Sequence, residues 1–162
     1  MDTHDFISRF GAVYEHSPWV AEQAAAVAAG VEDPQRIAEI MADCVDNADV
    51  DRQLALIRAH PDLADRARAA GELTADSSAE QASAGLDRCS KVEYERFSAL
   101  NDAYKEKFSF PFVMAVRDSS CKEILEVFSR RLQNDYDEEF ETALAEIHKI
   151  ARLRLQAMES GA

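Results

Sequence analysis

Apolar residues recur every three to four positions along most of the chain, which is the period of an amphipathic helix. Residues 34–45 show this clearly, with Ile37, Ile40, Met41, Cys44 and Val45 in one stripe behind the capping pair Asp33-Pro34. Residues 5–11, 18–29, 50–59, 62–70, 77–87, 90–104, 120–133 and 137–158 are also expected to be helical. Ser90-x-x-Glu93 reads as a capping box and Ser120-x-x-Glu123 as a cap of the helix that follows. The apolar face of residues 90–104 is expected to consist of Val92, Phe97, Leu100 and Tyr104. The pattern predicts an all-α chain of about eight helices.

One stretch departs from this period. Residues 108–117 read Phe-Ser-Phe-Pro-Phe-Val-Met-Ala-Val-Arg, which is apolar on every side and interrupted by Pro111. The run is too short for a core helix and too continuous for an amphipathic one, so we expect a buried extended segment. Backbone N–H and C=O groups without helical partners must find others, and a ligand is one possible source.

Length and composition agree with a helical globular protein. The chain has 162 residues, 47% of them hydrophobic, and only 5 Gly and 4 Pro. This length suits one hydrophobic core, and so few turn-forming residues favour helices over a β-sandwich. We therefore expect residues 1–162 to form a single compact helical domain.

Charge and cysteine content exclude several classes of function. The net charge is −13, and basic residues do not cluster with aromatics, so we expect no nucleic-acid partner. No apolar run approaches the length of a membrane span. Cys44, Cys89 and Cys121 are odd in number and widely spaced, which indicates neither a disulfide framework nor a zinc site. With termini typical of neither a signal peptide nor a peroxisomal address, the expected location is the cytoplasm.

His60 has the most suggestive local context among the four histidines. It follows the predicted helix 50–59 and precedes Pro61, which should force it into an extended conformation at the helix end. Its ordinary pKa, near 6.5, suits proton transfer at neutral pH. It can equally be a residue that only caps the helix. His4, His16 and His148 are interpreted as surface or capping residues.

Glu80 and Arg154 have two interpretations each. Ser77-x-x-Glu80 reads as a capping box, yet a helix start of this kind can also place a carboxylate in a site. Arg154 falls on the apolar stripe of the last helix, where a permanent charge needs a partner. Snorkelling, an internal ion pair and a dimer interface all explain it, as does an anion or carbonyl clamp. Arg117 is ambiguous in a similar way.

Some chemistries fit poorly. Arg130 and Arg131 are expected on a solvated face. No serine stands on a Gly-rich elbow, which disfavours a Ser-His-Asp hydrolase. None of the cysteines has a basic neighbour placed to activate it as a nucleophile.

Four separated motifs together resemble one family, OHCU decarboxylase, where OHCU is 2-oxo-4-hydroxy-4-carboxy-5-ureidoimidazoline. They are His60-Pro61-Asp62-Leu63-Ala64; Ser77-x-x-Glu80-Gln81 with Ala84-Gly85-Leu86; Leu100-Asn101-x-x-Tyr104 followed by Lys107-Phe108-x-Phe110-Pro111-Phe112-Val113; and Ala143-Leu144-x-Glu146-Ile147-x-Lys149-Ile150-x-x-Leu153-Arg154-Leu155. The resemblance covers roughly residues 5–156. It implies an all-helical, cofactor-independent homodimer that converts OHCU to (S)-allantoin in urate degradation.

The resemblance also implies roles for particular residues. His60, Glu80 and Arg154 match the catalytic histidine, the catalytic carboxylate and the active-site arginine. The positions that match substrate contacts are Pro61, Ser77, Gln81 and the backbone of Phe112, Val113, Met114, Ala115 and Val116. Ser109 departs from the glycine that many members have there, which we expect to adjust a turn without removing the activity. The alternative is a non-catalytic helical module that binds a purine-derived ligand or a protein partner.

Overall fold

The computed structural model describes residues 2–63, 89–117 and 119–159. These residues form helices and no strand, which confirms the all-α class: α1 Thr3–Phe10, α2 Trp19–Val27, α3 Pro34–Asp46, α4 Val50–Ala59, α7 Lys91–Phe108, α8 Cys121–Arg131 and α9 Tyr136–Glu159. The helices predicted at 62–70 and 77–87 lie outside the described residues, apart from the first positions of the former. The chain divides into two compact units, each described by itself below.

Short-range capping explains where most helices begin. The side chains of Asp2, Asp33 and Asp49 each accept a hydrogen bond from a backbone N–H in the first turn of α1, α3 and α4. The predicted capping box of α7 is confirmed, since Ser90 accepts from the Glu93 N–H while Glu93 accepts from the Ser90 N–H at 2.8 Å. Ser120 caps α8 as expected.

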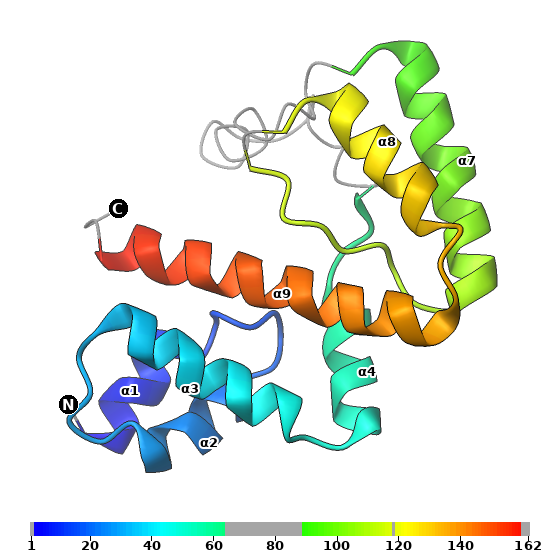
Figure 1. Cartoon of the computed structure of the whole chain (residues 1–162). Coiled ribbons are helices and arrows are strands. Elements are labelled where there is room, and N and C mark those ends of the chain that lie inside the picture. The colour runs from blue at the N-terminus through cyan, green and yellow to red at the C-terminus, as the bar shows by residue number, and fades with distance from the viewer. Residues whose placement is uncertain (1, 64–88, 118, 160–162) are drawn as a thin grey trace. The chain divides into compact units, whose positions relative to one another are not determined.

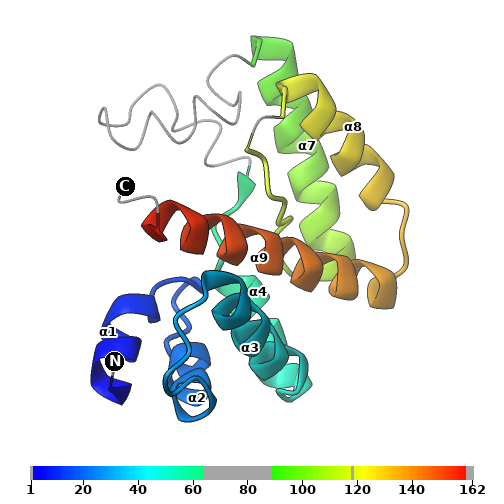
Figure 2. The ribbon, with the colours of Figure 1, turned by 60° about the vertical axis from the view of Figure 1, so that its left-hand side comes forward.

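The first unit contains residues 1–60 and 144–162. Helix α2 packs against both α1 and α3, and the three lie together in both ribbon views (Figures 1 and 2). Its core includes Phe6, Phe10, Val20, Ile37, Met41, Val45, Ile57, Ile147 and Ala151, all of which are buried. The spacing of apolar residues every three to four positions therefore predicts the buried faces of α3 and α9 correctly.

His148 joins three parts of this unit, contrary to our expectation of a surface or capping residue. Its side chain is only 13% exposed and lies on α9. The Tyr14 hydroxyl lies 2.7 Å from Nδ1, and Asp46 of α3 lies 3.0 Å from Nε2. A neutral imidazole that accepts from Tyr14 and donates to Asp46 satisfies both contacts. His148 thus ties the loop after α1 to α3 and α9.

The second unit contains residues 61–143. Helices α7 and α8 run side by side in the same direction, and the chain between them returns along the pair (Figures 1 and 2). Arg96 of α7 donates to Ser129 of α8, and the ring centres of the adjacent residues Phe97 and Phe128 lie 6.3 Å apart. Aromatic side chains fill the interior: Tyr104, Phe108, Phe110, Phe112 and Phe128 are all buried.

The predicted departure from helix is present, but it begins later than residue 108. Helix α7 continues through Phe108, and Ser109 ends it in the left-handed conformation at φ 61°. Such a C-terminal position favours glycine, because any side chain there costs conformational energy. Residues 111–116 then follow without regular structure. The buried face of α7 also differs from the expectation, since Val92 is 73% exposed and Asn101 is buried.

A disulfide joins the starts of α7 and α8, although the number and spacing of the cysteines indicated no disulfide framework. Cys89 precedes the Ser90 cap and Cys121 opens α8, with Cα atoms 5.6 Å apart. The remaining cysteine, Cys44, is free. The parallel arrangement of the two helices brings together cysteines that are 32 positions apart in sequence.

Breaking this disulfide is expected to lower the free energy of unfolding by about 2–4 kcal/mol, since it closes a loop of more than thirty residues in the unfolded chain. Urea unfolding of the Cys89→Ser/Cys121→Ser variant measures the change. Cys44→Ser is the matched control and should unfold like the parent chain. Three titratable thiols in the oxidised native protein would contradict the assignment.

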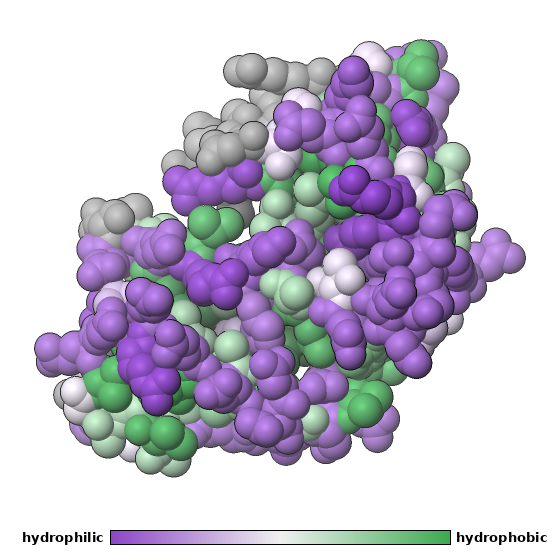
Figure 3. All heavy atoms as spheres, viewed as in Figure 1, coloured by the Kyte–Doolittle hydropathy of each residue, from purple (hydrophilic) through white to green (hydrophobic). Residues whose placement is uncertain are grey.

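The surface agrees with the strong negative charge. In the view of Figure 3, hydrophilic side chains cover most of the described surface and hydrophobic ones appear in separate small areas. Large apolar side chains that are exposed include Val27, Val50, Val92 and Tyr136. Within the described ranges, no helix has the length and apolar character needed to cross a bilayer.

Candidate functional site

The site residues predicted from sequence are spread over both units. His60 and Arg154 belong to the first unit, and Pro61 and Phe112–Val116 belong to the second. Ser77, Glu80 and Gln81 lie outside the described residues, so the expected meeting of Glu80 with His60 stays a prediction.

His60 sits at the C-terminal end of α4, where the following proline was expected to hold it extended. Its φ and ψ angles of −76° and 139° confirm this. The buried neighbours Leu56 and Ile57 fix the last turn of the helix in the core. Although histidine is polar, only 7% of its surface is exposed. The imidazole is therefore held within the protein and does not project into solvent.

The hydrogen bond of the imidazole selects its tautomer. His60 Nδ1 lies 2.9 Å from the Leu56 carbonyl oxygen, which can only accept. Nδ1 must therefore carry the hydrogen, and in the neutral ring Nε2 is the nitrogen with the lone pair that can accept a proton. A backbone carbonyl that fixes one ring nitrogen leaves the other correctly oriented for general acid–base chemistry.

Arg154 has an internal ion pair, as one of its interpretations expected. Its Nη2 donates to Glu15 Oε2 at 2.7 Å, and its Nη1 donates to the Val13 carbonyl at 3.0 Å. The side chain is 36% exposed, so it reaches from the apolar face of α9 toward solvent. A guanidinium has five N–H groups, and among the described residues these two bonds use only two of them.

Glu15 is the residue that sequence reasoning missed in this group. Burial alone raises the pKa of Glu15. The hydrogen bond and charge of Arg154, followed by the charges of His60 and His16, outweigh burial and hold the pKa below its ordinary value. Glu15 is thus a carboxylate at neutral pH and lies within electrostatic range of both Arg154 and His60. No sequence signal indicated it, because it lies in the irregular loop between α1 and α2.

The predicted binding segment of the second unit is buried and irregular. Phe112, Val113 and Val116 are buried, whereas Met114 and Ala115 are partly exposed and Arg117 is exposed. Within the described residues, Phe112, Val113 and Met114 form no backbone–backbone hydrogen bond. The Val113 carbonyl instead accepts from Arg131 Nη1 at 2.7 Å. Binding of a ligand by the backbone of this segment stays a prediction.

Arg131 is buried, so our expectation of a solvated face was wrong for it and correct only for Arg130. Arg131 is 5% exposed, and its Nε donates to Glu139 Oε1 at 2.6 Å. Tyr104 donates to the same oxygen at 2.7 Å, and Asn134 donates to the other at 3.0 Å. Burial and then the hydrogen bond and charge of Glu139 raise the pKa of Tyr104 above its ordinary range, so its hydroxyl stays a donor.

Asn101 is a second polar residue inside this unit. It lies one turn before Tyr104 on the buried face of α7 and is 8% exposed. Its Oδ1 is buried and finds no donor among the described residues. A buried acceptor without a donor lowers the stability of the folded protein. Besides the Arg131–Glu139 pair, Asn101 is thus a further polar group in the interior of this unit.

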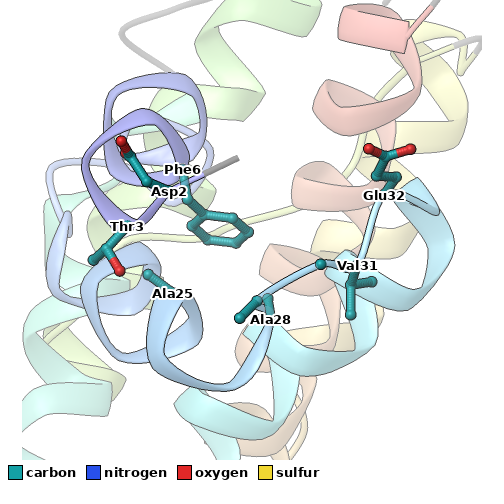
Figure 4. Close-up of a pocket in the computed structure, with 9 residues that line it drawn as sticks. Asp2, Thr3, Phe6, Ala25, Ala28, Val31 and Glu32 are labelled. Carbon is teal, nitrogen blue, oxygen red and sulfur yellow. The ribbon is translucent and has the colours of Figure 1, made fainter.

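A shallow pocket of about 180 Å³ lies elsewhere in the first unit. Phe6 and Ala25 form its apolar wall, and Asp2, Thr3 and Glu32 stand at its edge (Figure 4). None of the predicted site residues lines it. In the described part of the chain, no three histidine, cysteine or carboxylate side chains gather as a metal site would require.

Comparison with known proteins relates these residues to one family. A family model described as OHCU decarboxylase matches residues 1–156. A 2-oxo-4-hydroxy-4-carboxy-5-ureidoimidazoline decarboxylase of Haloferax volcanii is 45% identical over 155 residues, covering 96% of this chain and 89% of the relative.

Two solved structures share the fold. The crystal structure of an (S)-allantoin synthase has a TM-score of 0.77 and 33% identity, covering 97% of this chain and 50% of that one. The crystal structure of an OHCU decarboxylase in the presence of (S)-allantoin has a TM-score of 0.73 and 26% identity, covering 91% and 95%. With the motif residues in place and matches of this length, the chain belongs to the OHCU decarboxylase family.

Proposed function

We propose that this protein decarboxylates 2-oxo-4-hydroxy-4-carboxy-5-ureidoimidazoline to (S)-allantoin in urate degradation. The observation that carries the proposal is His60, which is held in the interior with Nδ1 donating to the Leu56 carbonyl, so that Nε2 is the ring nitrogen that can accept a proton. Family membership over residues 1–156 supplies the substrate class.

The chemistry of the substrate explains why side chains suffice. Its carboxylate stands on a ring carbon that also bears a hydroxyl and lies next to the conjugated C–N system of the ring. Loss of CO₂ leaves an electron pair on that carbon, and the ring can accept it, so no separate electron sink is required. The protein must orient the carboxylate out of the ring plane, manage the hydroxyl proton and deliver a proton to one face.

We assign these tasks to the predicted residues. His60 Nε2 exchanges a proton with the substrate hydroxyl. Glu80 orients the imidazole or the ring N–H groups. Arg154 holds a ring or ureido oxygen and stabilises developing negative charge. Pro61, Ser77 and Gln81 contact the substrate, and the backbone of Phe112–Val116 pairs with the ureido group.

The charges around Arg154 suit an anionic substrate. The net charge of −13 repels anions at long range, so a local positive charge is needed to bind one. Glu15 neutralises part of the guanidinium charge but occupies only one edge of it. The remaining N–H groups can bind a substrate oxygen while Glu15 and Val13 keep the side chain in place.

An assay with freshly generated OHCU tests the activity. We expect the purified protein to accelerate the ultraviolet decay of OHCU well above the spontaneous rate in matched buffer. If the protein binds allantoin but does not accelerate the decay of OHCU, the alternative function, a non-catalytic binding module, would be favoured instead.

Arg154→Met is expected to lower kcat/KM by about 10–100-fold, mainly through KM, because a hydrogen bond from a charged group to the substrate is lost. Steady-state kinetics of Arg154→Met and Glu15→Gln distinguish two roles of Arg154: binding the substrate, or serving only as the ion-pair partner of Glu15. If Arg154 serves only as the partner of Glu15, both variants will change KM equally. We expect Glu15→Gln to change it far less.

The family resemblance and the net charge support further proposals on oligomeric state, nucleic-acid binding, domain organisation and location. We expect a homodimer, which sedimentation equilibrium tests, and no affinity for duplex DNA, given the net charge of −13. We also propose that residues 1–162 act as one domain in the cytoplasm. A disulfide is unusual in a reducing compartment, so alkylation of thiols in freshly lysed cells is the informative check of location.

A further inference from the structure

We propose that Arg131 is a positioning residue for the reaction, because it fixes the backbone of Phe112–Met114 in the orientation that binds substrate. The inference rests on the proposed function, which assigns substrate contacts to this segment. It adds a residue outside the sequence motifs and a physical reason why an irregular segment can bind with defined geometry.

Arg131 holds the segment at two neighbouring points. Its Nη1 donates to the Val113 carbonyl at 2.7 Å, and its guanidinium lies 4.3 Å from the centre of the Phe112 ring. Phe128 stacks on the same ring at 3.8 Å with an interplanar angle of 7°. Since Phe128 occupies one face of the ring, the guanidinium must lie on the other. Phe112 is therefore clamped between α8 side chains on both faces.

The clamp is itself anchored. Glu139 is fully buried, and its carboxylate accepts from Arg131, Tyr104 and Asn134. A buried charge pair whose remaining lone pairs are hydrogen-bonded has little freedom to move, because any displacement leaves a polar group unpaired. The guanidinium thus takes its position from α7 and α9 as well as from its own helix α8.

Fixing one carbonyl also fixes the next N–H. The Val113 C=O and the Met114 N–H belong to one planar trans peptide, so they point in opposite directions. With the carbonyl held on Arg131, the Met114 N–H faces away from the buried pair. Met114 is partly exposed and makes no backbone–backbone hydrogen bond within the described residues. The structure assigns this N–H as a donor to an oxygen of the substrate.

Arg131→Lys tests the inference while keeping a positive charge beside Glu139. A lysine ammonium cannot stack flat on Phe112 and bond both Glu139 and Val113 in the same geometry. We expect KM for OHCU and the Kd for (S)-allantoin to rise together by about tenfold, with kcat within about twofold of the parent, since the loss is in binding.

Two variants serve as controls. Tyr104→Phe removes one hydrogen bond to Glu139 but keeps the clamp, so its thermal midpoint should fall while KM stays within about twofold. Arg130→Lys changes an exposed neighbour and should alter neither quantity. Arg131→Lys with a lower midpoint but an unchanged KM and Kd overturns the inference, and so does an equal rise of KM in Tyr104→Phe. A parent protein that does not accelerate OHCU decay would instead overturn the proposed function.

Discussion

Replacing His60 by asparagine is expected to lower kcat by about 10²–10⁴-fold, the usual contribution of general acid–base catalysis. The asparagine amide N–H can still donate to the Leu56 carbonyl in place of Nδ1, so the end of α4 should keep its conformation. The variant loses Nε2, the ring nitrogen to which the proposed mechanism assigns proton transfer. Steady-state kinetics with OHCU and far-ultraviolet circular dichroism measure the activity and the fold of the variant separately.

His148→Asn provides the matched control. His148 is another largely buried histidine of the first unit, with Tyr14 and Asp46 as its partners. Its replacement should lower stability and leave kcat close to that of the parent protein. Turnover of His60→Asn within a few fold of the parent would remove His60 from the chemistry and leave it as a helix-ending residue.

Replacing Arg131 by methionine is expected to cost about 3–5 kcal/mol of unfolding free energy, because it leaves the Glu139 carboxylate buried without its counter-ion. The variant also loses the bond to the Val113 carbonyl and the contact with the Phe112 ring. Urea-induced unfolding followed by circular dichroism gives the difference. This is the largest effect on stability that we expect from a single substitution in the described residues.

The double variant Arg131→Met/Glu139→Leu distinguishes the stability lost with the ion pair from the stability lost with the packing around it. Removing both charges together should restore much of the lost stability, since no uncompensated charge is then buried. The double-variant cycle therefore predicts a strong coupling between the two positions. Additive losses would show that Arg131 and Glu139 stabilise the protein independently.

The sequence predicted those features that depend on neighbouring residues. The Ser90-x-x-Glu93 box, the Ser120 cap and the proline after His60 each act within four residues, and each has its expected local structure. The stripe of α3 predicted its buried face for the same reason. The extended conformation of His60 was therefore predictable from sequence alone.

Features that depend on distant partners were missed. Arg131 looked solvated because its acceptors, Glu139 and the Val113 carbonyl, stand 8 and 18 residues away and meet it only in the folded chain. Cys89 and Cys121 come together only because α7 and α8 run in parallel. Glu15 reaches Arg154 across 139 positions. The spacing of apolar residues within one helix cannot distinguish a buried, paired charge from a solvated one.

The stereochemistry of the product tests the central claim most directly. Spontaneous decay of OHCU gives racemic allantoin, whereas an active site that protonates one face gives a single enantiomer. We expect allantoin formed in the presence of this protein to show the circular dichroism of the (S) form from the start of the reaction. Racemic allantoin appearing at the spontaneous rate would contradict it.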